Sequence, residues 1–199
     1  MTRLIPILLL ISISVFGQNN NKERDILLAT KKEDGVYKTF IEFRTNSPSI
    51  KGTLKITNHK IKLLNEQTNK FVNIRESYWG ACLNDTVYVF LDDPHTAQSP
   101  HIYTLDLLGR YCYFSDYGVY TTMTPGLAWN SSSYKAEYVI NINNGIIYKI
   151  DKKLMREILS KDPNLLNEFE AESNKRQVFK KYIEIINTKR TGDIKPLTE

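Results

Sequence analysis

The segment from Trp79 to Phe114 constrains the fold more than any other part of the 199-residue chain. It contains both cysteines and is rich in β-branched and aromatic residues, which favour strands. Asn84-Asp85 separates two apolar runs, Trp79–Leu83 and Thr86–Leu91. Because Asn and Asp tolerate positive φ, this arrangement predicts a tight β-hairpin. We interpret the segment as the central sheet of a small domain.

The order of periodicities along the chain predicts an α+β fold. Strand-like segments dominate up to Ile150, and helical spacing follows from Lys152. We expect a mostly antiparallel, strongly twisted sheet, preceded by a short amphipathic helix near Thr39–Thr45. Two C-terminal helices should pack on this sheet, one over Lys152–Leu159 and one that begins at Asp162-Pro163. The polar stretch Glu170–Gln177 indicates that the second helix either projects into solvent or breaks there.

Two further strand regions have distinct turn signals. Asn143-Asn144-Gly145 joins two β-rich runs and predicts a hairpin that ends at Ile150. In the strand Tyr111–Phe114, alternation places the two tyrosines on one face and Cys112 and Phe114 on the other. Asp116-Tyr117-Gly118 predicts a turn after this strand. Trp129–Ser133 is interpreted as a loop.

The first residues are typical of a secretory signal peptide. Arg3 precedes the apolar run Leu4–Phe16, which is shorter than the ~20 residues of a membrane span. We therefore predict a periplasmic or secreted protein with no membrane span after signal removal. The expected organisation is a signal peptide over 1–17, a flexible segment over 18–24, a single domain over 25–190 and a flexible tail over 191–199.

The positive charge of the chain does not by itself indicate a partner. The formal net charge is +5, but the basic residues are scattered and no long block of like charge occurs. Nucleic acid is therefore not an expected partner, and an exported protein would rarely meet it. An unidentified envelope protein or glycan is the partner class that the predicted location favours.

The two cysteines allow two interpretations. Cys82 and Cys112 lie in predicted strands of an exported protein, where an oxidising compartment favours a disulfide. The alternative is two buried free thiols that pack as small apolar side chains. We predict the disulfide between Cys82 and Cys112.

Aromatic residues on the central strands also allow two interpretations. They could line a face that binds sugar or peptide, since tyrosine and tryptophan combine an apolar body with a polar group. The alternative is ordinary core and cross-strand packing. The residues of this candidate ligand face are Trp79, Tyr111, Tyr113, Tyr117 and Tyr120.

Catalytic and metal-binding signals are weak. The chain has no Gly-rich phosphate loop, no Gly-x-Ser-x-Gly and no His-Glu-x-x-His motif. Asp92-Asp93-Pro94-His95 with His101 could gather metal ligands in one loop, but its spacing matches no established zinc motif. We therefore predict no catalytic residue, no metal and no cofactor. If the protein were a hydrolase acting on an envelope polymer, its acids would come from Asp92, Asp93 or Asp116.

Four segments of the chain carry a recognisable combination of residues: Gly35–Ile50, Trp79-Gly80-x-Cys82, Gly109–Phe114 and Leu159–Phe169. Together they resemble a group of uncharacterised secreted proteins of Bacteroidota-type bacteria. The resemblance covers most of the chain after the leader and implies location and architecture, with no mechanism. Asp85-Thr86-Val87 is also similar to an O-glycosylation acceptor of such bacteria, a three-residue match that would place the glycan on Thr86.

These observations favour a non-enzymatic binding or accessory protein of the cell envelope. The sequence leaves two alternatives open. One is the envelope-polymer hydrolase, and the other is a carbohydrate-binding module that uses the aromatic face.

Overall fold

Four stacked layers make up the molecule in a computed structural model, which describes residues 25–57, 60–91, 101–123 and 129–189. The α+β prediction is confirmed, with antiparallel sheets and helices at the C-terminal end. The strands are β1 (Gly35–Tyr37), β2 (Leu54–Thr57), β3 (Lys60–Asn65), β4 (Lys70–Asn73), β5 (Gly80–Leu83), β6 (Thr86–Leu91), β7 (His101–Thr104), β8 (Tyr111–Met123), β9 (Trp129–Asn141) and β10 (Ile147–Lys149). The helices are α2 (Phe40–Arg44), α3 (Lys152–Leu159), α4 (Pro163–Ala171), the 3₁₀ helix η1 (Lys175–Val178) and α5 (Phe179–Lys189).

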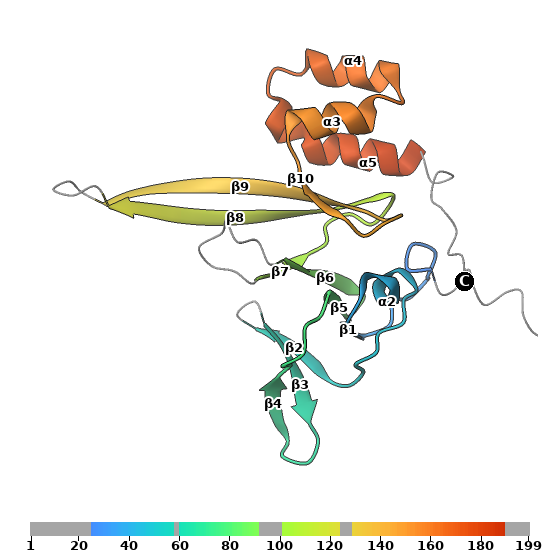
Figure 1. Ribbon diagram of the computed structural model, residues 1–199, viewed down its shortest axis with the longest axis vertical. Helices are drawn as coiled ribbons and strands as arrows, with labels where there is room; N and C mark the ends of the chain where they lie inside the picture. The colour runs from blue at the N-terminus through green and yellow to red at the C-terminus, as the bar shows by residue number, and fades with distance from the viewer. Residues whose placement is uncertain (1–24, 58–59, 92–100, 124–128, 190–199) are drawn as a thin grey trace, which may run out of the picture.

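The strands form three separate sheets rather than one. Their orders are β1-β5-β6-β7, β10-β9-β8 and β2-β3-β4. In Figure 1 the helices α3, α4 and α5 lie on one side of the β10-β9-β8 sheet, and the β1-β5-β6-β7 sheet lies on its other side. The β2-β3-β4 sheet forms the far end of the molecule (Figure 1). The predicted central segment is therefore divided, because β5, β6 and β7 belong to one sheet and β8 belongs to another.

Three hydrophobic clusters fill the spaces between these layers. The alternation of side chains on β8 explains how one strand supplies two of them, since Phe114 faces the β1-β5-β6-β7 sheet and Tyr113 faces the helices. The third cluster joins β1-β5-β6-β7 to β2-β3-β4 through Leu54, Ile61 and Ala81. The face assignment made from the sequence for Tyr111–Phe114 is thus confirmed.

Local sequence signals account for the tight turns and the first helix. Asn84 and Asp85 have φ of 51° and 63°, the left-handed values that the predicted β5–β6 hairpin requires. Gly145 has φ of 72° in the turn between β9 and β10. Thr39 caps α2 by accepting a hydrogen bond from the backbone N–H of Glu42. Each of these elements was predicted near its observed position.

The turn and loop predictions around β8 and β9 were wrong. The predicted turn at Asp116-Tyr117-Gly118 lies within β8, and the predicted loop Trp129–Ser133 lies within β9. The two strands pair continuously, from Tyr111 opposite Asn141 to Met123 opposite Trp129. They form a long ribbon that extends past the other layers in Figure 1. Long-range pairing of thirteen residues on each strand overrides a local turn signal.

The C-terminal region breaks at its polar stretch, which gives α4 and α5 with η1 between them. Asp151 and Asp162 cap α3 and α4 through the backbone N–H groups of Leu154 and Leu165, at 2.7 and 3.1 Å. The helix that begins at Asp162-Pro163 ends at Ala171, within the polar stretch. Two C-terminal helices were predicted, and α5 is a third. None of the described helices is long and apolar enough to cross a membrane.

Gly80 lets two strands approach closely. A Cβ atom at this position would lie 2.3 Å from the backbone carbonyl oxygen of Tyr88, which cannot move without displacing β6. We expect Gly80→Ala to lower the free energy of unfolding by about 1–3 kcal/mol, the usual cost of overpacking. Chemical denaturation measures this, and an unchanged midpoint and slope would contradict the close approach.

Candidate anion-binding groove

The structure describes the side chains of four residues of the predicted ligand face, Trp79, Tyr111, Tyr113 and Tyr117, and these four do not form one exposed surface. Trp79 is half-buried and stacks on Phe43, with ring centroids 4.3 Å apart. Tyr113 is only 1% exposed, and Tyr111 is half-buried. Tyr117 is the exposed one, at 72%. The side chain of Tyr120 lies outside the described part of the chain.

The predicted Cys82–Cys112 disulfide is not formed. Both cysteines are buried free thiols. Cys82 lies on β5 and Cys112 on β8, in different sheets that pack against the same hydrophobic cluster. Burial raises the pKa of each thiol to about 12, and nearby Asp34 adds to the effect at Cys82. Both thiols are therefore protonated at neutral pH and unsuited to nucleophilic chemistry.

Thiol titration tests this assignment. In the native protein isolated from its natural compartment, we expect both cysteines to react very slowly with a water-soluble disulfide reagent, because they are buried and protonated. After unfolding in denaturant without reductant, two thiols should titrate. No titratable thiol after unfolding would instead show the disulfide.

The acidic and histidine residues considered for chemistry do not converge in the described structure. Asp92, Asp93 and His95 lie outside the described residues. His101 is on β7 in edge contact with the ring of Tyr103, and Asp116 is half-buried on β8. Within the described ranges, no group of three or more His, Cys, Asp or Glu side chains could hold a metal ion. Thr86 of the short glycosylation-like match is half-buried at the start of β6.

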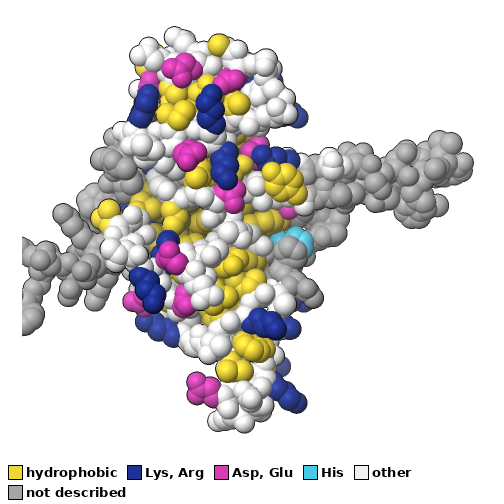
Figure 2. Space-filling model, turned by 180° about the vertical axis from the view of Figure 1, so that it is seen from behind, with side chains coloured by type: hydrophobic (Ala, Val, Ile, Leu, Met, Phe, Trp, Pro, Cys, Tyr) yellow, Lys and Arg dark blue, Asp and Glu magenta, His cyan; other side chains and the backbone are white. Residues whose placement is uncertain are grey.

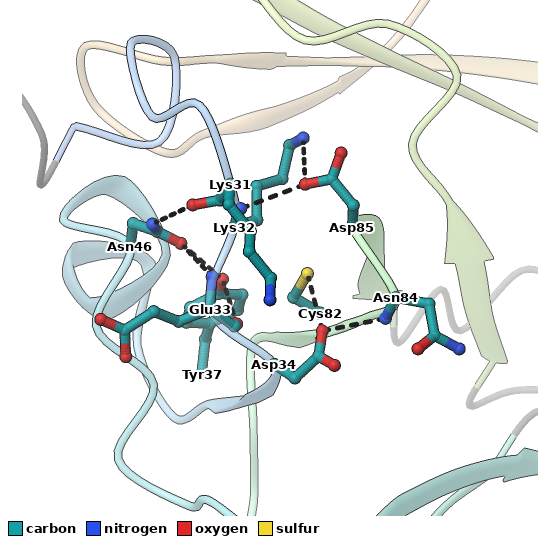
Figure 3. Close-up of polar contacts among 9 residues, drawn as sticks. All are labelled: Lys31, Lys32, Glu33, Asp34, Tyr37, Asn46, Cys82, Asn84 and Asp85. Atoms are coloured by element: carbon teal, nitrogen blue, oxygen red, sulfur yellow. Dashed lines mark hydrogen bonds and ion pairs between the residues drawn. The ribbon is translucent and has the colours of Figure 1, made fainter.

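The segment before β1 is bound to the β5–β6 turn by polar contacts (Figure 3). Lys32 donates from both its backbone N–H and its Nζ to Asp85, at 3.1 and 2.9 Å. Asp34 accepts from the backbone N–H of Asn84 at 2.9 Å and from the Cys82 thiol at 3.8 Å. These bonds fix the segment on the sheet and occupy the charged groups of Lys32 and Asp34, so the cluster has a structural role.

A large open groove lies between the edge of β9 and the helical layer. Its volume is about 1080 Å³, and its walls come from β9, the end of β10, the first turn of α3, η1 and the start of α5. The helix-facing side of β9 contributes Ser133 and Glu137, and α5 contributes buried Phe179. The groove thus joins segments that are more than forty positions apart in the sequence.

Positive charge predominates in this groove. Two carboxylates line it, Glu137 and Asp151, and both have partners, since Glu137 accepts from Lys135 at 2.8 Å and Asp151 caps α3. On the face of the molecule seen in Figure 2, basic and acidic side chains lie close to one another over the helical layer. Six basic residues line the groove: Lys135, Lys149, Lys152, Lys153, Arg156 and Arg176.

Four of these basic residues have no carboxylate partner among the residues that the structure describes. Arg156 is bound to Glu170, with Nε 2.6 Å from Oε1, and Lys135 is bound to Glu137. The four others are exposed and make no ion pair with a described carboxylate: Lys149, Lys152, Lys153 and Arg176. Their charges are therefore available to a ligand, and closely spaced like charges attract an anion more strongly than isolated ones.

Two of the lysines oppose the stability of the helix that carries them. Lys152 and Lys153 are the first two residues of α3, and no acidic residue lies in its first turn. The N-terminal end of a helix carries partial positive charge, so basic residues there are unfavourable by a few tenths of a kcal/mol or more each. Because the Asp151 carboxylate already caps this helix end, it is the charge of the two lysines that favours an anion in the groove.

A buried hydrogen-bonded cluster supports the floor of the groove. The hydroxyl of Tyr113 donates to Oε1 of Glu137, which is 7% exposed and also binds Lys135. Burial raises the pKa of Tyr113, and the adjacent carboxylate adds to this. Burial opposes the charge on Lys135, but its hydrogen bond and attraction to Glu137 raise its pKa overall. Lys135 is thus held as a cation at the groove wall, in contact with Glu137.

Sequence reasoning missed this groove because its basic residues are dispersed. Lys135, Lys149, Lys152-Lys153 and Arg176 come from four elements and form no run of like charge. The signal that could have found it is the pair Lys152-Lys153 directly after the helix cap Asp151, a position where acidic residues are expected.

Comparisons with known proteins place the chain in a family by sequence. No curated protein and no solved structure matches it. A family model described as a family of unknown function, DUF6563, matches residues 35–190, which include every strand and helix of the four layers. The chain therefore belongs to this family of unknown function.

Proposed function

We propose that this protein is a secreted or periplasmic, non-enzymatic binding protein of the cell envelope that holds an anionic partner in its basic groove. The observation that carries the proposal is the set of four basic side chains around one open groove that have no carboxylate partner in the described ranges of the chain. Envelope proteins and glycans that bear carboxylate or phosphate groups are partners of the required charge.

The state of the acidic groups in the groove supports a binding role. A general acid or base needs a carboxyl group that is free to exchange a proton with a substrate. Glu137 is occupied by Tyr113 and Lys135, and Asp151 is occupied by the backbone of α3. What the groove offers to a ligand is therefore fixed positive charge, which binds an anion without transforming it.

The other two functions proposed from the sequence have less support. A carbohydrate-binding module would need Tyr111 and Tyr113 to be accessible. Tyr113 is buried under the helices, and Tyr111 is half-buried. For the hydrolase, a cleft would need two convergent carboxyl groups. Of the acids suggested for that reaction, Asp116 is the one that the structure describes, and it does not line the groove.

Charge reversal at the start of α3 tests the proposal. In Lys152→Glu/Lys153→Glu, we expect affinity for short, fluorescently labelled polyglutamate and oligogalacturonate probes to fall by about tenfold or more, which corresponds to ~1.4 kcal/mol. The same variant should be at least as stable as the native protein, because glutamates in the first turn favour the helix dipole. Fluorescence anisotropy and thermal unfolding measure the two effects.

A matched control separates the groove from overall charge. Lys60→Glu/Lys70→Glu changes the net charge by the same amount at exposed positions of the β3–β4 hairpin, on a different sheet. Binding of both probes by this control should stay within about twofold of the native value, a difference of ~0.4 kcal/mol. If both double variants lose affinity equally, binding depends on net charge and the groove is not the site.

A further inference from the structure

One edge of β9 is open where it lines the groove. The strand has β8 along its whole length on one side, but on the other side β10 pairs only with Tyr138–Ile140. The last bond on that side runs from the backbone N–H of Ile150 to the carbonyl oxygen of Glu137, at 2.7 Å. Within the described part of the chain, no strand continues this edge towards Ser133.

The backbone direction along this edge follows from strand geometry. In an antiparallel ladder, the N–H and C=O groups of one residue point to the same side, and the side alternates along the strand. Glu137 and Asn141 direct backbone groups towards β10, since Asn141 donates to Ile146 and Glu137 accepts from Ile150. Lys135 and Ser133 therefore present their backbone groups to the groove.

The groove combines this open edge with the four basic side chains that have no described carboxylate partner. A chain laid along β9 beyond β10 would run past the first turn of α3 and past η1, because these elements line the same groove. Lys152 and Lys153 from α3 and Arg176 from η1 would then meet its side chains. Main-chain hydrogen bonds favour a polypeptide over a glycan, and the surrounding charge selects an acidic one.

We propose that the groove takes an extended acidic peptide segment of a partner protein, which adds to the open edge of β9 as a strand. This inference rests on the proposed anion binding and names its partner class. The added strand would form hydrogen bonds with the backbone of Ser133 and Lys135. Its carboxylates would be neutralised by Lys152 and Lys153 of α3 and Arg176 of η1.

The experiment compares two probes on the full-length protein. The first is an acetylated and amidated peptide of alternating glutamate and threonine. The second is the same peptide with its backbone nitrogens methylated at alternate residues, on the edge that would face β9. Methylation keeps the charge but removes the donors that a strand needs. We expect it to weaken binding by about tenfold, or ~1.4 kcal/mol. Equal affinity of the two peptides would overturn strand addition.

A variant of the edge provides the complementary test. Proline is tolerated on an edge strand where the replaced N–H faces outward, so Ser133→Pro should fold and lose one donor to the peptide. Ser133→Ala keeps that donor and is the matched control. We expect the proline variant alone to bind the acidic peptide more weakly. If Ser133→Pro fails to fold, the methylated peptide decides the question.

The outcomes separate this inference from the proposed function. One outcome retains the anion site and overturns strand addition. In it, Lys152→Glu/Lys153→Glu loses affinity for the peptide, the native protein binds the methylated peptide as tightly as the unmethylated one, and Ser133→Pro binds the unmethylated peptide with native affinity. Stronger binding of oligogalacturonate than of the peptide would also overturn it, in favour of a glycan. Binding unaffected by Lys152→Glu/Lys153→Glu would contradict the proposed function itself.

Discussion

Arg44→Ala should lower the free energy of unfolding by about 3–5 kcal/mol, the cost of leaving one charge of a buried pair uncompensated. The Arg44 side chain is 3% exposed and its Nη1 forms an ion pair with Oδ1 of Asp25, which is 10% exposed. The backbone N–H of Ile26 also donates to the carbonyl oxygen of Arg44 at 3.1 Å. The pair therefore joins the end of α2 to the segment that precedes β1.

A double-mutant cycle measures the pair itself. Asp25→Ala/Arg44→Ala removes both charges, so its loss of stability should be smaller than the sum of the two single losses, by an interaction energy of about 0.5–3 kcal/mol. Lys51→Ala is the exposed comparison, since Lys51 and Glu33 are 63% and 52% exposed. Its effect should be about 0–1 kcal/mol. Additive losses in the cycle would show that Asp25 and Arg44 do not stabilise each other.

Phe114→Ala should have a similarly large effect, of about 3–5 kcal/mol, because it opens a cavity between two sheets. Phe114 is 0% exposed and lies between the rings of Tyr138 and Tyr103, with centroids at 5.0 and 5.6 Å. Tyr138 belongs to β9 and Tyr103 to β7, so this ring connects the ribbon to the β1-β5-β6-β7 sheet. Denaturant unfolding measures the loss.

The control for Phe114 lies on the same strand. Tyr117 is 72% exposed and its ring contacts Lys135 at 5.6 Å. Tyr117→Ala should therefore cost no more than about 0.5–1 kcal/mol, the size of an exposed cation–π contact. Comparable losses in the two variants would mean that Phe114 does not carry the packing between the sheets.

The elements predicted well from the sequence are those whose signals are local. Asn84-Asp85 formed the predicted turn because both residues adopt positive φ, and Asp162-Pro163 began a helix because a cap and a first-turn proline act within one turn. The continuation of β8 through Asp116-Tyr117-Gly118 depends instead on pairing with β9. The turn propensity of these three residues carries no information about that long-range pairing. Local signals therefore predicted where turns and helices begin, but they did not predict how far β8 and β9 extend.

The site was harder to predict than the fold, because it depends on which distant residues the layers bring together. The sequence showed Lys152-Lys153 and the basic stretch near Arg176 as separate, scattered charges. They face one groove because α3 and η1 pack beside the open edge of β9. The disulfide prediction failed for the opposite reason. The expected oxidising compartment favoured a bond between Cys82 and Cys112, but the fold places them on different sheets as free thiols.

The most direct test of the anion-binding groove is a nuclear magnetic resonance titration of the native protein with the short polyglutamate probe at low salt. We expect shifted resonances to concentrate on Lys149, Lys152, Lys153 and Arg176, with Lys60 and Lys70 on the β3–β4 hairpin unaffected. Shifts spread evenly over the lysines of the whole chain, or centred on the β3–β4 hairpin, would contradict this expectation.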